Sequence, residues 1–343
     1  MAVRALWFRA GSLYLLDQRE LPGRTVVRRL TRVRQVADAI RSMMVRGAPS
    51  IGVAAAYGMV LARSEGGFSS EQAAELLRST RPTAHDLFVG IEVVRRAWED
   101  GEDVRKAADR YRDEVVEECH RIGIAGAPLL RKAKRVLTHC NAGALATVEW
   151  GTALAPIRVA RSEGAELFVW VDETRPLLQG SRLTAWELSK ERIPHAVIVD
   201  NAAGPFMRTG QVDAVIVGAD RIARNGDFAN KIGTYEKAVV AHENGIPFYV
   251  AAPWSTFDPL CKDGDSIPVE ERQAEEVTSV AGRRTAPRSS PARNPAFDIT
   301  PAKYVTAFVT PDGVVRPDDL AKLLGARAVL RRLRGRPRSK RER

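Results

Sequence analysis

Two segments in the second half of the chain carry residues that could move protons and hold a phosphate. Segment 213–217 is short and rich in β-branched residues, which is typical of a strand buried on both faces of a parallel sheet, and Asp220 follows its end. Ligands bind at the carboxyl ends of such strands, so Asp220 is a candidate acid. Lys231 precedes a predicted helix over 235–243 with Thr234 as N-cap, and together with the free first-turn amides it predicts an anion site. The pattern indicates proton chemistry on a phosphorylated small molecule; alternatively, Asp220 caps a turn and Lys231 is a solvated loop cation.

Cys140 occupies the same kind of position in an earlier segment. It follows a predicted strand at 135–139 and begins a small-residue turn, 140–147, which we expect to enter a helix running toward Leu154. A helix dipole stabilises a nearby thiolate, so this placement predicts a lowered pKa and a thiol that can carry protons or act as a nucleophile. The alternative is a small buried residue with an inert sulfur.

Two other polar residues flank predicted elements. A strand at 167–171 runs into the polar segment 172–182, in which Gln179 could orient sugar hydroxyls through its donor and its acceptor. The stretch 45–58 indicates a tight turn that enters a close-packed, small-residue helix, and Arg46 in this turn suits a bidentate contact with phosphate or carboxylate. The alternative in both cases is an exposed polar side chain on the surface.

These residues lie in longer stretches that resemble one family. The chain is similar over roughly residues 1–325 to the methylthioribose-1-phosphate isomerases, relatives of the alpha, beta and delta regulatory subunits of the translation initiation factor guanine-nucleotide exchange factor. The matching stretches are Arg46-Gly47-Ala48-Pro49, Arg81-Pro82-Thr83-Ala84, Thr138-His139-Cys140-Asn141-Ala142-Gly143, Asp172-Glu173-Thr174-Arg175-Pro176, Gln179-Gly180, Gly218-Ala219-Asp220-Arg221-Ile222, Asn230-Lys231-Ile232-Gly233-Thr234 and Asn294-Pro295-Ala296-Phe297-Asp298.

The resemblance implies an aldose–ketose isomerase that converts 5-methylthioribose 1-phosphate to 5-methylthioribulose 1-phosphate in methionine salvage, as a homodimer. It implies Asp220 as proton donor, and Cys140 as the partner that stabilises the transition state or moves the second proton. The residues implied to contact the substrate are Arg46, Gly47, Ala48, Arg81, Gln179, Asn230 and Lys231. The alternatives are an isomerase of 5-deoxyribose 1-phosphate or ribose 1,5-bisphosphate, and a non-enzymatic, initiation-factor-like regulatory protein that keeps the pocket as a sugar-phosphate sensor.

The chain departs from the family pattern in two places. His85-Asp86 stands where an aliphatic residue and an asparagine are usual, and Gly204-Pro205-Phe206 replaces a more polar sequence. Either change could alter the pocket for the substituent on C5 of the sugar. The reaction type is therefore better defined by the sequence than the exact substrate.

The reaction explains the need for an acid. An aldose with phosphate on C1 cannot open its ring by losing the anomeric proton, because that oxygen is esterified. An acid must assist at the ring oxygen, and hydrogen then moves from C2 to C1 as a proton through an enolate or as a hydride. The apolar strand before Asp220 would desolvate its carboxylate and favour the protonated form. Neither route requires a metal or a redox cofactor, and we expect none.

The pattern along the chain predicts an α/β protein with a helical N-terminal domain followed by a Rossmann-like, mostly parallel sheet domain. We expect a helical domain over 1–125, a catalytic domain over 126–330 and a basic, disordered tail over 331–343. A hairpin is predicted at 5–16, helices at 31–44, 70–79 and 104–122, and strands at 135–139, 167–171, 196–199, 213–217, 247–251 and 304–309. The loop 282–296, rich in Arg, Pro and Ser, is expected to cross the site or a subunit contact. A Gly-x-Gly-x-x-Gly fingerprint is absent from the first turn of the sheet domain, which argues against a nicotinamide cofactor.

Charge and composition favour a cytoplasmic enzyme. The net charge is +11, but the last thirteen residues hold eight Lys/Arg and one Glu, so the rest of the chain carries only about +4. Such a tail is usually solvated, with nonspecific nucleic-acid contact as the alternative. No run of 18 apolar residues and no signal-peptide core is present, so we expect no membrane segment. Three widely separated cysteines and five histidines without ligand spacing argue against a disulfide framework or a metal site.

Overall fold

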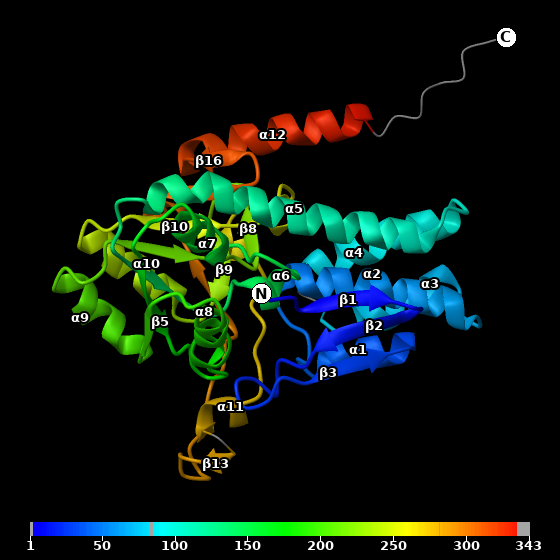
Figure 1. Cartoon of the computed structure of the whole chain (residues 1–343), viewed down its shortest axis with the longest axis horizontal. Coiled ribbons are helices and arrows are strands. Elements are labelled where there is room, and N and C mark those ends of the chain that lie inside the picture. The colour runs from blue at the N-terminus through cyan, green and yellow to red at the C-terminus, as the bar shows by residue number, and fades with distance from the viewer. Residues whose placement is uncertain (1–2, 82–84, 281, 335–343) are drawn as a thin grey trace.

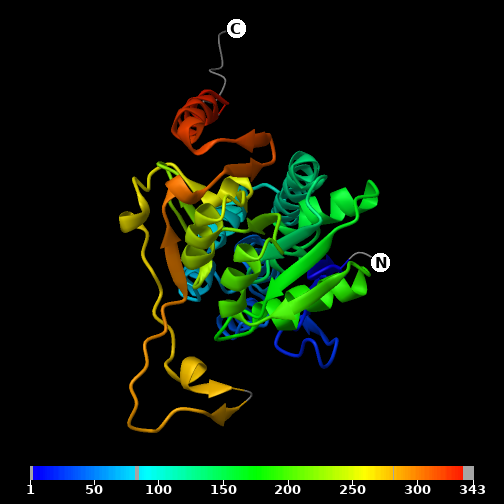
Figure 2. The same ribbon diagram turned by 90° about the vertical axis from the view of Figure 1, so that its left-hand side faces the viewer.

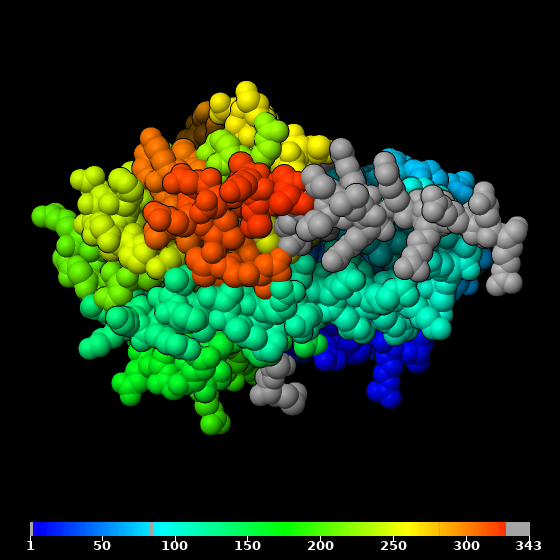
Figure 3. All heavy atoms as spheres, turned by 90° about the horizontal axis from the view of Figure 1, so that it is seen from above, coloured from blue at the N-terminus to red at the C-terminus, as the bar shows by residue number. Residues whose placement is uncertain are grey.

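The computed structural model describes the chain except residues 1–2, 82–84, 281 and 335–343. The elements that precede α5 lie together on one side of the molecule, and the large sheet with its helices lies on the other (Figure 1). One helix, α5 (Val104–Leu130), runs along both parts and forms a continuous ridge on the surface (Figure 3). The protein is therefore a mixed α/β fold, as the sequence predicts.

The N-terminal part combines a small antiparallel sheet with five helices. Its strands, in sheet order, are β1 (Leu6–Arg9), β2 (Ser12–Leu16) and β3 (Val27–Leu30). The hairpin β1–β2 is confirmed, whereas β3 was not predicted. The helices are α1 (Val33–Arg41), α2 (Ala48–Glu65), α3 (Ser70–Arg78), α4 (His85–Glu99) and α5.

Helix α2 is the centre of this part, and its composition explains its packing. Fourteen of its eighteen residues are buried, among them a run of small residues. A Cβ atom added to Gly90 of α4 would lie 2.2 Å from the carbonyl oxygen of Gly52 in α2, so only glycine permits this close approach of the two helices. The sequence correctly predicts a close-packed helix here.

Helix α5 is longer than the predicted helix over 104–122. Gly123, Gly126 and Pro128 look like helix-ending residues in the sequence, but the helix continues to Leu130. A Cβ atom on Gly126 would lie 2.5 Å from Cγ of Pro156 in helix α7 (Leu154–Ser162), so this glycine serves helix packing. Tertiary contact thus overrides the local signal.

The second part contains a seven-stranded sheet in which all neighbours are parallel except the edge strand β16. Its order is β16 (Gly313–Val315), β15 (Ala307–Thr310), β10 (Phe248–Ala251), β7 (Ala214–Val217), β4 (Arg135–Thr138), β5 (Phe168–Asp172) and β6 (His195–Ile198). All six strands predicted for this domain are present, with ends shifted by at most three residues.

Each face of this sheet packs against its own set of helices, and successive residues of a strand contribute to the two faces in turn. Val136 of β4 packs with α5, α7 and α8 (Ala185–Lys190), while its neighbour Leu137 packs with α9 (Ala203–Arg208), α10 (Thr234–Glu243) and α12 (Pro317–Arg334). Successive residues of a strand point to opposite faces, so near-continuous apolar strands are needed when both faces are covered. The apolar runs predicted as strands are continuous because both faces of the sheet are covered.

A smaller, four-stranded sheet lies beside the carboxyl ends of the large one and was not predicted. Its strands, in order, are β11 (Phe257–Asp258), β8 (Arg221–Ala223), β9 (Phe228–Lys231) and β14 (Phe297–Thr300). Between β11 and β14 the chain makes an excursion that contains α11 (Glu275–Thr278) and the strand pair β12 (Ser279–Val280) and β13 (Arg283–Arg284), which project from the body (Figure 2). The predicted loop 282–296 is the returning arm of this excursion.

The remaining short elements join these sheets. They are α6 (Ala144–Thr147), the π-helical turn η1 (Gly180–Thr184) and the 3₁₀ turns η2 (Asp200–Ala202), η3 (Trp254–Thr256), η4 (Gly264–Ser266) and η5 (Ala302–Tyr304). Helix α12 extends to Arg334, so the first four residues of the predicted disordered tail are helical, and residues 335–343 lie outside the described part of the chain. Among the described helices none has the length and hydropathy that a membrane span needs.

Candidate active site

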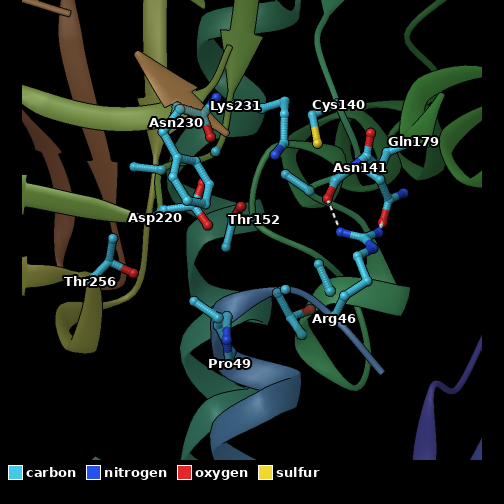
Figure 4. Close-up of a pocket in the computed structure, with 18 of the residues that line it drawn as sticks. Arg46, Pro49, Cys140, Asn141, Thr152, Gln179, Asp220, Asn230, Lys231 and Thr256 are labelled. Carbon is cyan, nitrogen blue, oxygen red and sulfur yellow. Dashed lines mark hydrogen bonds between the residues drawn. The ribbon is translucent and has the colours of Figure 1, made fainter. Parts of the chain in front are cut away.

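All nine residues singled out by the sequence line a single cavity beyond the carboxyl ends of β4, β5 and β7, where helix α2 begins (Figure 4). They are Arg46, Gly47, Ala48, Arg81, Cys140, Gln179, Asp220, Asn230 and Lys231. Ligands bind at such strand ends in α/β sheets, because the loops there diverge. The roles of these residues stay predictions, but their convergence from six separate segments is an observation.

Asp220 lies three residues beyond β7, where a short link leads into β8. Its backbone N–H donates to the carbonyl of Ala229 at 2.9 Å, which fixes the link against β9. Burial raises the pKa of the Asp220 carboxyl, while the nearby cations Lys231, Arg81 and Arg46 lower it and Glu270 raises it further. The net rise matches the prediction that this carboxyl is held toward its protonated form.

Cys140 adopts a backbone conformation that non-glycine residues rarely use. Its φ angle is +64°, its N–H donates to the Thr174 hydroxyl at 2.8 Å, and its carbonyl accepts from the Thr184 hydroxyl at 2.6 Å. The left-handed conformation costs energy that these two hydrogen bonds help to offset. The thiol is thereby held at the wall of the cavity (Figure 4).

The predicted lowering of the Cys140 pKa is wrong. Burial raises the pKa of this thiol, and the positive charges of Lys231 and Arg46 offset only part of that rise. The expected helix toward Leu154 does not form, since α6 ends at Thr147 and Val148 has a φ of +77°. The thiol is therefore held toward its neutral form, which suits a proton donor better than a nucleophile.

The first amides of α6 also serve a different partner. Ala144 N–H and Leu145 N–H donate to the Glu187 carboxylate at 2.7 and 3.2 Å. Glu187 is fully buried and also accepts from Asn141 at 2.9 Å and Arg158 at 2.7 Å. A buried carboxylate that satisfies the helix terminus leaves little of its dipole for Cys140.

Lys231 is the last residue of strand β9 rather than a loop cation. Only 8% of it is exposed, its Nζ donates to the Ala296 carbonyl at 2.8 Å, and the same atom lies 4.6 Å from the centre of the Phe297 ring. Burial lowers the Lys231 pKa, while the acidic groups of Cys140 and Asp220 raise it. A buried cation of this kind offers a strong, poorly screened partner for an anion.

The anion site predicted at the amides of α10 is wrong as stated. The N-cap is Gly233 and not Thr234, and the N–H groups of Gly233 and Tyr235 donate to the Asp298 carboxylate at 2.7 and 3.1 Å. These amides are occupied by an acidic side chain from β14. Lys231 and the adjacent Asn230, on the cavity wall before α10, remain the candidates to bind an anion there.

Arg46 and Gly47 form the wall at the start of α2. The Arg46 guanidinium is buried and donates to the Gln18 side chain at 3.1 Å and to both the carbonyl and the side-chain oxygen of Asn141 (Figure 4). Gly47 has a φ of +90°, and a Cβ atom there would lie 2.5 Å from Cα of Ala146, so no other residue fits. The predicted exposed alternative for Arg46 is excluded.

Three buried polar atoms on the cavity wall have no hydrogen-bond partner within the described residues. They are Nε of Arg81, Oε1 of Gln179 and Oγ1 of Thr256. Arg81 otherwise contacts Glu270 at 3.4 Å and Met43, and Gln179 is only 4% exposed. Buried polar groups are normally satisfied, so the atoms of Arg81 and Gln179 point to a ligand that donates to Gln179 and accepts from Arg81.

The sequence did not predict a polar cluster behind the cavity. His139 lies between Asp172, 2.9 Å from its Nδ1, and the carbonyl of Ile232, 2.8 Å from its Nε2, and Lys237 lies 3.6 Å from Asp172. His139, Asp172 and Asp200 are the one group of metal-type side chains close together in the described residues, but each already takes part in hydrogen bonds. These three residues lie at or just after the ends of β4, β5 and β6, and that position in the sequence could have predicted the cluster. The cluster ties three strand ends to the turn after Lys231.

This geometry defines a class of protein. A doubly covered, mostly parallel sheet carries at its strand ends a cavity with a carboxyl and a thiol whose pKa values are raised, beside buried cations, which suits a small phosphorylated ligand and proton transfer to it. The chain belongs to the initiation factor 2 subunit family, whose pattern it matches over residues 44–317.

Individual relatives agree with this assignment. The chain is 49% identical to the methylthioribose-1-phosphate isomerase of Geotalea daltonii, over 95% of this chain and 100% of the relative, and 48% identical to that of Aquifex aeolicus, over 94% and 71%. Its fold is similar to the crystal structure of 5-methylthioribose 1-phosphate isomerase from Pyrococcus horikoshii, with a TM-score of 0.88, 44% identity and coverage of 95% and 96%. It is also similar to the structure titled translation initiation factor eIF-2B subunit delta from A. fulgidus, with a TM-score of 0.83, 45% identity and coverage of 93% and 97%.

Proposed function

We propose that this chain is an aldose–ketose isomerase that converts 5-methylthioribose 1-phosphate to 5-methylthioribulose 1-phosphate in methionine salvage. The observation that carries the proposal is the shared cavity of Asp220 and Cys140, both held toward their protonated forms beside buried cations. Relatives named methylthioribose-1-phosphate isomerase match nearly the whole chain at 47–49% identity. The proposal therefore rests on site chemistry and on relatedness together.

The cavity supports different catalytic roles for Asp220 and Cys140, and Asp220 acts first. Its protonated carboxyl gives a proton to the ring oxygen, which opens a ring whose anomeric oxygen is blocked by phosphate. Hydrogen then moves from C2 to C1, and the C2 hydroxyl becomes the ketone by giving its proton to the Asp220 carboxylate, which restores the acid. The neutral Cys140 thiol stabilises the developing charge or moves the second proton. A water-poor cavity strengthens both effects, because charges there are poorly screened.

The remaining wall would hold the substrate in place. We assign the phosphate to Lys231 and Arg46, with Arg81 and Asn230 beside them, because the buried cations are the strongest anion partners in the cavity. Gln179 would accept a hydrogen bond from a sugar hydroxyl through its unpartnered oxygen. Gly47 and Ala48 present backbone close to the ligand, since neither has a side chain large enough to intervene.

One observation favours a second candidate, a sugar-phosphate sensor of the initiation-factor type. The A. fulgidus structure titled as an eIF-2B subunit is 45% identical to this chain. A sensor needs the anion contacts but not the two proton carriers, so Asp220 and Cys140 favour the enzyme. Isomerisation of 5-deoxyribose 1-phosphate or ribose 1,5-bisphosphate is the other alternative.

Assaying the purified chain with each of the three sugar phosphates tests the proposal. We expect formation of the ketose product, followed by ¹³C NMR, to be fastest with 5-methylthioribose 1-phosphate. Faster turnover of one of the other two would change the substrate and keep the reaction. Tight binding without turnover of any of them would support the sensor.

Lys231→Met is expected to weaken binding of the sugar phosphate by at least roughly tenfold, since a hydrogen bond to a charged group contributes about 1.5–3 kcal/mol. Calorimetry with the ketose product measures this directly. Methionine keeps the length and the apolar contact with Phe297, so the fold should persist. The matched control is Lys262→Met at an exposed lysine, which should bind normally. Unchanged affinity in Lys231→Met would remove Lys231 from the phosphate site.

We also propose that the chain acts as a cytoplasmic homodimer, and that its helical part before residue 125 and its catalytic part after it are joined by the continuous helix α5. Support for a dimer comes from the sheet edge at β6, where Val197 and the adjoining Val199 are 44% and 58% exposed. Exposed apolar edge strands commonly pair with another chain. Light scattering of Val197→Lys against the unchanged chain would test the interface.

A further inference from the structure

A second cavity shares a wall with the active site and is rich in arginine. Met43, Arg46 and Gln179 line both cavities, and the second one continues to Arg19, Arg182, Arg272 and Glu276. We call it the arginine vestibule, defined by Arg19, Arg46, Gln179, Arg182, Arg272 and Glu276. A space that adjoins the site at the Arg46 wall is a natural route for a ligand to approach Arg46.

The arginines of the vestibule differ in how their charge is balanced. Arg19 forms an ion pair with Asp17 at 2.8 Å, and Arg272 pairs with Glu276 at 2.5 Å. A carboxylate at this distance cancels most of the field that a guanidinium projects into the cavity. These two residues therefore contribute little to attraction of an anion.

Arg182 has no such carboxylate among its hydrogen-bond partners. Its guanidinium and Nε donate only to main-chain carbonyls, those of Gln18, Arg19, Leu21 and Leu177, at 2.9–3.3 Å. Carbonyl oxygens fix the position of the side chain but leave its net charge in place. Burial lowers the Arg182 pKa, and a guanidinium still stays protonated in a protein.

Arg46 carries a second charge without a carboxylate hydrogen-bond partner, deeper along the same path, and the nearby acids Glu187 and Asp220 offset only part of the pKa lowering that burial causes. Its hydrogen bonds go to the amide oxygen of Gln18 and to Asn141, all of them neutral groups. Repulsion from Arg182 contributes to the lowered Arg46 pKa, so the two guanidinium groups interact electrostatically across the vestibule. Two fixed positive charges in succession favour movement of an anion from the first to the second.

Gln179 gives an independent indication that a polar ligand passes this point. It is 4% exposed, lines both cavities, and its Oε1 has no hydrogen-bond partner in the described chain. A buried acceptor without a partner is expensive unless a ligand supplies a donor. Sugar hydroxyls are donors, and a phosphate is the anion, so a sugar phosphate fits both requirements.

We propose that the arginine vestibule is the entrance of the site and that Arg182 is a binding residue that draws the phosphorylated ligand toward Arg46. The inference rests on the proposed function for the identity of the ligand, but not for its charge. Fixed charge along an entrance accelerates association and is weakened by salt, since exposed charges are screened beyond about 8–10 Å at ordinary ionic strength.

The test compares association rate constants for 5-methylthioribose 1-phosphate and for inorganic phosphate, measured by stopped flow at low and high salt. Arg182→Gln is expected to slow association roughly fivefold or more at low salt, with the difference shrinking to less than twofold near 0.5 M salt. Arg182→Lys keeps the charge and should retain most of the rate. Arg131→Gln removes one charge from an exposed arginine paired with Glu163 and should behave like the unchanged chain.

Two outcomes would overturn the proposal. Equal slowing in Arg182→Gln and Arg131→Gln would mean that only total charge matters. An association rate that does not fall with salt in the unchanged chain would exclude steering even if Arg182→Gln fails to fold. Failure of the proposed function looks different, because a salt-dependent, Arg182-dependent association without turnover would leave the vestibule in place and remove the isomerase.

Discussion

Asp220→Asn is expected to lower turnover of the sugar phosphate at least ~10²-fold, the lower range for loss of an acid–base group. Asparagine has nearly the same shape and can accept the same hydrogen bonds, but it has no proton to give. Because burial raises the Asp220 pKa, the acid form extends to higher pH than for an ordinary aspartate, and turnover should fall as pH rises through that raised pKa. Steady-state rates against pH, with circular dichroism as the check on folding, measure both effects.

Cys140→Ser belongs to the same prediction and serves as its comparison. Serine is isosteric but a much weaker acid, so turnover should also fall by at least ~10²-fold if the thiol donates a proton. Near-normal turnover in either folded variant would exclude that residue from the mechanism. Cys119→Ser is the matched control, since Cys119 is a fully buried thiol on α5 that does not line the cavity.

Asp86→Asn is expected to stabilise the protein at pH 8 by on the order of 4 kcal/mol. Asp86 on α4 is completely buried, and neither of its carboxyl oxygens has a partner in hydrogen-bonding geometry among the described residues. Burial and the nearby acids Glu118 and Asp220 raise its pKa from 3.8 to about 7, while the Ser255 hydroxyl lowers it somewhat. Each pKa unit corresponds to about 1.4 kcal/mol, and this shift is roughly three units.

The pH dependence of this effect fixes its sign. Between pH 4 and pH 7 the folded chain holds a proton on Asp86 that the unfolded chain has lost, so stability decreases as pH rises through this window. The gain from asparagine should therefore be small near pH 4 and complete above pH 7, as denaturant unfolding at both values would reveal. Asp38→Asn, at a side chain that is 75% exposed, is the control and should change stability by less than about 0.5 kcal/mol. Destabilisation of Asp86→Asn at pH 8 would contradict the prediction.

The sequence predicted the large sheet and the site because both depend on local pattern. Short, β-branched apolar runs such as 213–217 favour strands with two covered faces, and the residue that follows the end of such a strand lies near its counterparts at one edge of the sheet. Asp220 and Cys140 were found by this rule alone. The motifs of the family added Arg81, whose sequence context has no distinctive local pattern.

What the sequence could not predict depends on partners distant in the chain. Asp298 takes the amides of α10 from 63 and 65 residues away, and Glu187 takes those of α6 from more than 40 residues away. Both remove an anion site that the local pattern alone favours. Lys231 also depends on a distant partner, because it lies at the end of β9 where the strand pairs with Phe297 of β14.

Helix α5 belongs to both cores and joins the two parts of the protein into one folding unit. Its first half supplies Ala108, Tyr111 and Val115 to the core around α2, and its second half supplies Ile122 and Leu130 to the core against the large sheet. A helix of 27 residues is about 40 Å long, so it reaches from one core to the other. A cut near residue 125 would divide this helix and leave each fragment with an uncovered apolar face. Neither half of the chain is therefore expected to fold without the other.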